Sequence, residues 1–144
     1  ATDVQDGTTA GLTVTGFITG SVRISFGQTT AENATGYQGV SVAGAALSGG
    51  AGGVVEIASS LGEVLSASGG EALIASAIGD TSGSGLTAGH DLMFVLYGGG
   101  KAYLYLVEIN TVDSNLDAAD MDVELVGVLN SVTADAITST NFGG

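Results

Sequence analysis

Oxygen-bearing side chains are concentrated between residues 108 and 122, in the stretch EINTVDSNLDAADMD. Hard divalent cations such as Ca²⁺ bind about six to eight oxygen ligands, from carboxylates, amides and backbone carbonyls. A loop that carries such side chains at short intervals can curl around one ion. The stretch therefore predicts a calcium site, whose ligands would be Asp113, Asn115, Asp117, Asp120 and Glu108.

The second half of this stretch resembles the later part of an EF-hand or dockerin-like loop. Its ligands would fall at loop positions 5, 7, 9 and 12, in the order Asp113, Asn115, Asp117 and Asp120. The first half departs from that pattern, because Ile109 and Thr111 stand where ligands belong and Ser114 replaces the usual glycine. Glu108 or Asn110 would then ligate through a bulge. The alternative is an acidic solvent loop, in which an aspartate caps a short helical turn at 117–121.

Catalytic chemistry has less support in the sequence. His90 is the only histidine, and it lies in a glycine-containing turn beside Asp91 without a nucleophile elbow anywhere in the chain. The stretch YGGGKA, 97–102, lacks the first glycine and the Ser or Thr of a P-loop. The chain has no cysteine, which excludes thiolate metal sites and disulfides. We therefore expect that it is not an enzyme.

The charge is strongly one-sided, with 15 acidic residues against 2 basic ones and a net charge of -13. This balance excludes binding to phosphate backbones and to anionic lipid surfaces. Divalent cations are the natural partners. No apolar run approaches the length of a transmembrane helix, so no membrane insertion is expected.

The elements that would position these residues are mainly strands. Short apolar runs bounded by turn residues predict them at 12–18, 21–26, 37–44, 91–97, 101–109 and 121–128. The strands 91–97 and 101–109 would form a hairpin through the glycines at 98–100, and the tail would add a last short strand ending at Phe142. Apolar spacings of three and four predict two short helices, at 57–67 and 70–78. The expected fold is a mainly β, antiparallel, sandwich-like single domain over 1–144, with helices within about 57–78 and an extended arm at 1–11.

The hairpin strand at 101–109 is apolar on both sides. Tyr103, Tyr105, Val107 and Ile109 alternate with Ala102, Leu104 and Leu106, and Glu108 alone interrupts the second set. Hydrophobic residues make up 44% of the chain and charged ones 12%, about half the usual share of roughly 25%. The chain has no proline and one lysine, residues that protect the edges of natural sheets. These features favour self-association, while an ordinary monomeric sandwich stays the alternative.

Three stretches resemble the C-terminal regions of RTX (haemolysin-type calcium-binding) and related bacterial surface proteins. They are LTVTGFITGSVRISFG at 12–27, LTAGHDLMFVLYGGGKAYLYLVEIN at 86–110 and DAADMDVELVGVLNSVTADAITSTNF at 117–142. The resemblance implies type I secretion without a cleaved N-terminal signal, a place at the cell surface and calcium-assisted folding. The chain departs from the family in three ways. It lacks tandem nonapeptides, Val22-Arg23 stands where the family usually has an acidic-basic pair, and Gly99-Gly100 replaces a more polar turn.

The sequence thus predicts an extracellular bacterial structural protein that self-assembles into a filament, tube or surface layer through β-edge and apolar contacts. Tubular surface appendages of marine bacteria, such as spinae, are one kind of object to which it could belong. The alternative is a Ca²⁺-binding C-terminal module of a secreted RTX-type adhesin, which acts in export or attachment.

Overall fold

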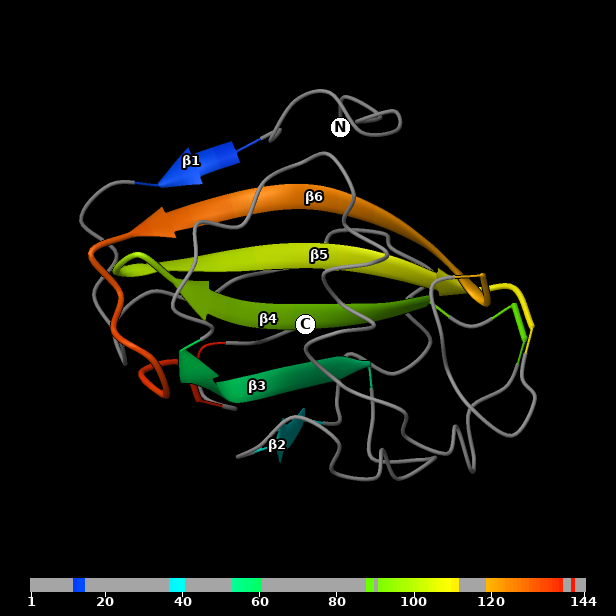
Figure 1. The fold of residues 1–144 in the computed structure, drawn as a ribbon, viewed down its shortest axis with the longest axis horizontal. Helices are drawn as coiled ribbons and strands as arrows, with labels where there is room; N and C mark the ends of the chain where they lie inside the picture. The colour runs from blue at the N-terminus through cyan, green and yellow to red at the C-terminus, as the bar shows by residue number, and fades with distance from the viewer. Residues whose placement is uncertain are drawn as a thin grey trace.

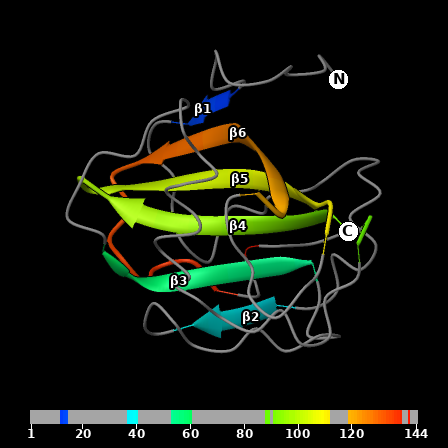
Figure 2. The ribbon, with the colours of Figure 1, turned by 45° about the vertical axis from the view of Figure 1, so that its right-hand side comes forward.

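A computed structural model describes residues 12–14, 37–40, 53–60, 88–89, 91–111, 119–138 and 141, and they build one mixed β-sheet (Figure 1). Its strands are β1 (Leu12–Val14), β2 (Tyr37–Val40), β3 (Val54–Ser60), β4 (Asp91–Gly98), β5 (Lys101–Ile109) and β6 (Met121–Asn130). Their spatial order is β1-β6-β5-β4-β3-β2, so the four longer strands form the centre and the two shortest form the edges (Figures 1 and 2). The predicted β class is confirmed at this level.

The β4–β5 hairpin forms as the glycines predict. Gly98 pairs with Lys101, which leaves Gly99 and Gly100 as a two-residue turn. Their φ angles are 58° and 74°. Two-residue turns whose twist matches that of the strands need positive φ at both positions, and glycine adopts it without steric cost. The turn is therefore one residue shorter than the three glycines suggest, and it fixes the register of the whole hairpin.

The prediction of an antiparallel sheet is wrong for three of the five pairings. β4, β5 and β6 are antiparallel neighbours, whereas β3 runs parallel to β4, β2 parallel to β3 and β1 parallel to β6. Each parallel pair joins strands far apart in sequence or separated by a long connection, as parallel pairing requires. A local apolar pattern carries no information on the direction of such a partner.

The first predicted helix, 57–67, is wrong at its start. Residues Ile57–Ser60 belong to β3, where Ile57 pairs with Val40 of β2 and Ser60 with Tyr97 of β4. The β-branched residues at 54, 55 and 57 favour a strand, and the neighbouring strands decide the outcome. The described residues contain no helix of the predicted kind. The remainder of this prediction, the helix at 70–78, the strand at 21–26 and the arm at 1–11 lie outside the described residues.

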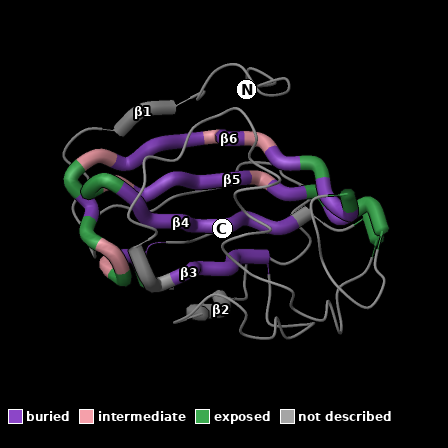
Figure 3. The backbone as a smooth tube through the Cα atoms, in the orientation of Figure 1, coloured by how far each residue is buried: buried purple, intermediate pink, exposed green. Residues whose placement is uncertain are grey.

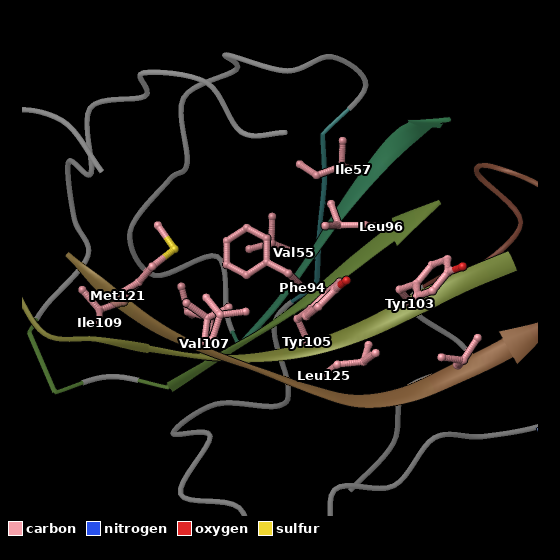
Figure 4. Close-up of a cluster of buried hydrophobic side chains, with 13 residues drawn as sticks. Val55, Ile57, Phe94, Leu96, Tyr103, Tyr105, Val107, Ile109, Met121 and Leu125 are labelled. Atoms are coloured by element: carbon pink, nitrogen blue, oxygen red, sulfur yellow. The ribbon is translucent and has the colours of Figure 1, made fainter. Parts of the chain in front are cut away.

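Over most of the length of β3 to β6, both faces of the sheet are buried within a single copy of the chain (Figure 3). Face A carries the larger cluster, shown in Figure 4: Val55, Ile57, Leu92, Phe94, Leu96, Tyr103, Tyr105, Val107, Ile109, Met121, Val123, Leu125 and Val128. Face B carries Val54, Met93, Val95, Tyr97, Ala102, Leu104 and Leu129, together with Val132 and Ile137 from the segment that follows β6. The predicted alternation along 101–109 is confirmed. Its second face is covered without a neighbouring molecule.

The segment after β6 does not form the predicted strand over its described part. Residues 131–138 make turns, and Asn141 accepts a 3.0 Å hydrogen bond from the backbone N–H of Thr138 through its side chain. The tail passes from the end of β6 across the strand ends toward β3 (Figures 1 and 2). Phe142 lies outside the described residues.

Candidate functional site

Several acidic positions of the described strands lie at the end of the sheet remote from the Gly99-Gly100 turn. The strand register places Asp91 opposite Glu108, and Glu108 opposite Asp122. Three acidic positions therefore form a row across β4, β5 and β6, on face B. Glu108 and Asp122 are exposed. Like charges directly opposite one another destabilise a sheet.

Face B changes in character along its length. It is fully buried near the turn, where Ala102 and Leu104 lie, and half-buried at Leu106. Beyond Leu106 it ends in the exposed Glu108. Apolar and acidic surface thus adjoin on one strand, and the acidic part faces solvent.

Asp120 is held by a local hydrogen-bond network and does not lie open to solvent. Its carboxylate accepts a 2.7 Å bond from the Thr111 hydroxyl, and its backbone oxygen accepts bonds from the N–H groups of Asn110 and Thr111 at 2.7 and 3.3 Å. Asn110 also donates a 3.0 Å bond to the Asp122 carboxylate. These bonds join the end of β5 to the start of β6, and Asp120 is 6% exposed. They define where the connecting loop leaves and rejoins the sheet.

The predicted calcium ligands are only partly described. Asp113, Asn115 and Asp117 lie outside the described residues. Glu108 is exposed and lies in the middle of the acidic row. The Asp120 carboxylate accepts a hydrogen bond from Thr111. Among the described residues no group of three or more His, Cys, Asp or Glu side chains has the arrangement of a metal site. The calcium site stays a prediction.

Sequence reasoning missed the two other positions of the acidic row. Asp122 is the last residue of the stretch 108–122 and was not predicted as a ligand, and Asp91 lies beside His90. The signal that could have found Asp91 is the hairpin turn. Once Gly99 and Gly100 are taken as a two-residue turn, residue 98 pairs with 101, and Asp91 falls opposite Glu108.

A second polar group lies inside face B. The Tyr97 hydroxyl donates a short hydrogen bond to a Glu56 carboxylate oxygen and accepts a 3.1 Å bond from the backbone N–H of Ile137. All three residues are at most 1% exposed. Buried polar groups require such partners, since an unsatisfied one costs about 1–3 kcal/mol. This network ties β3, β4 and the tail together.

Face A holds two tyrosines side by side on β5. Burial raises the pKa of Tyr103 above its ordinary value of 10.0. Burial also raises the pKa of Tyr105, and the neighbouring Tyr103 adds to that shift. Both hydroxyls therefore stay neutral in the folded protein over the physiological range.

Comparisons with known proteins add no relative. No protein-family model, curated protein or solved structure matches the chain. Within the described residues there is also no helix with the length and apolar character that crossing a membrane takes.

Proposed function

We propose that the chain is an extracellular structural protein of a bacterial surface, and that copies of it assemble by pairing the edges of their sheets. The observation that carries the proposal is the nature of the two edge strands. The sheet ends in β1 on one side and β2 on the other, and no described strand lies outside either of them. Their sequences, LTV and YQGV, contain no charged residue and no proline.

Natural proteins usually protect such edges with very short strands, lysine, proline, bulges or a covering element. β1 and β2 are short, with 3 and 4 residues, but contain neither lysine nor proline. Edges without charge can pair with another chain, because their backbone N–H and C=O groups form a ready template. The two edges of this sheet differ, so β1 of one copy would pair with β2 of the next. A contact between unlike surfaces repeats without closing unless the rotation between copies closes a ring, and it gives a filament or tube.

The face-to-face argument made from the sequence does not support the proposal, because one copy buries both of its faces. The charge does bear on it. A net charge of -13 on each copy opposes association. Salt screens this repulsion, with a Debye length of about 8–10 Å near physiological ionic strength. We therefore expect free subunits at low salt and polymers when salt or divalent cations screen them.

The test is sedimentation and negative-stain electron microscopy across a salt series, with the wild-type chain and two lysine variants. Gln38→Lys places a charge in the β2 edge, and Thr133→Lys adds the same charge at an exposed position after β6. Because each variant lowers the net negative charge equally, a pure charge effect would promote assembly in both. Edge pairing predicts that only Gln38→Lys blocks it. A wild-type chain that stays monomeric at every salt concentration contradicts the proposal.

A calcium-binding module of a secreted RTX-type protein is the second candidate. The row of acidic positions at 91, 108 and 122 favours it, since a cation would relieve their mutual repulsion. Under this reading calcium raises the melting temperature of a monomer more than magnesium does at equal ionic strength. Glu108→Gln would then remove most of that difference, whereas equal responses to both ions would leave only screening.

A further inference from the structure

We draw no further inference here: the strongest candidate, the row of acidic positions at Asp91, Glu108 and Asp122 across β4, β5 and β6, belongs to the site already described, and no second feature of the described residues points to a ligand there.

Discussion

The substitution Leu104→Lys tests whether face B is part of the core of one copy. Leu104 lies in the middle of β5, opposite Val95 of β4 and Gly127 of β6, and is 4% exposed. Leu106 lies two residues further along the same face, is half-buried, and pairs with Glu124 of β6. The variants Leu104→Lys and Leu106→Lys therefore introduce the same ammonium group at a buried and at a half-buried position of one face.

The expected costs differ severalfold. Removing a buried leucine side chain loses about 1.5–3 kcal/mol of hydrophobic stabilisation. A buried ammonium adds several kcal/mol in desolvation. Together these terms reach the whole stability of a typical domain, about 5–15 kcal/mol. At position 106 the ammonium can extend toward solvent and the acidic end of the face, where an opposite-charge cross-strand pair contributes about 0.2–1 kcal/mol. We expect Leu104→Lys to unfold the chain and Leu106→Lys to cost less than about 2 kcal/mol.

Urea unfolding followed by far-UV circular dichroism measures both variants at low salt, where the wild-type chain is expected to be monomeric. Sedimentation in parallel establishes the oligomeric state of each sample. A Leu104→Lys variant with a cooperative transition near the wild-type midpoint would show that Leu104 is not buried by its own chain. The reasoning would also fail if both variants lost the same stability, since the structure assigns them different surroundings.

Two further predictions concern the turn and face A. Gly100→Ala should lower the free energy of unfolding by about 1 kcal/mol, because φ of 74° is disfavoured for alanine. No atom lies within 4 Å of the added Cβ, so the cost comes from the backbone conformation alone. A urea midpoint unchanged from wild type would contradict this. Stability should fall as pH rises above about 10, because the raised pKa values of Tyr103 and Tyr105 let the folded state keep protons that the unfolded state releases there. Urea titrations between pH 8 and 11 at fixed high salt should show a shallower decline in Tyr103→Phe, and equal slopes in both proteins would refute the assignment.

The sequence predicted the hairpin and both of its faces because their signals are local. Alternation along 101–109 and the three glycines before it identify two strands, their direction and their sides. The same information places Asp91 opposite Glu108 once the turn length is known. What was missing was one residue of turn length, which decides whether Glu108 meets Asp91 or its neighbour.

The parallel pairings and the start of β3 could not be found in this way. Val54 pairs with both Tyr37 and Met93, residues that lie 17 and 39 positions away in the sequence. Its own surroundings, VVEIASSLGEVL, fit helical spacing as well as a strand. Pairing with β2 and β4 makes this segment a strand, as tertiary partners commonly decide the structure of short apolar runs. Coverage of face B by Val132 and Ile137 was equally hidden, since these two residues are five positions apart and fit neither strand nor helix spacing.

Burial of both faces in one copy changes where contacts between copies must be sought. The apolar excess of the described strands is used within the chain, so association cannot depend on a bare sheet face. The uncharged edges of β1 and β2 remain as the surfaces at which copies can meet. Gln38→Lys should therefore reduce assembly although it lowers the net negative charge, because it places a charge in the β2 edge. An unchanged amount of sedimented polymer at the same salt concentration would contradict edge pairing.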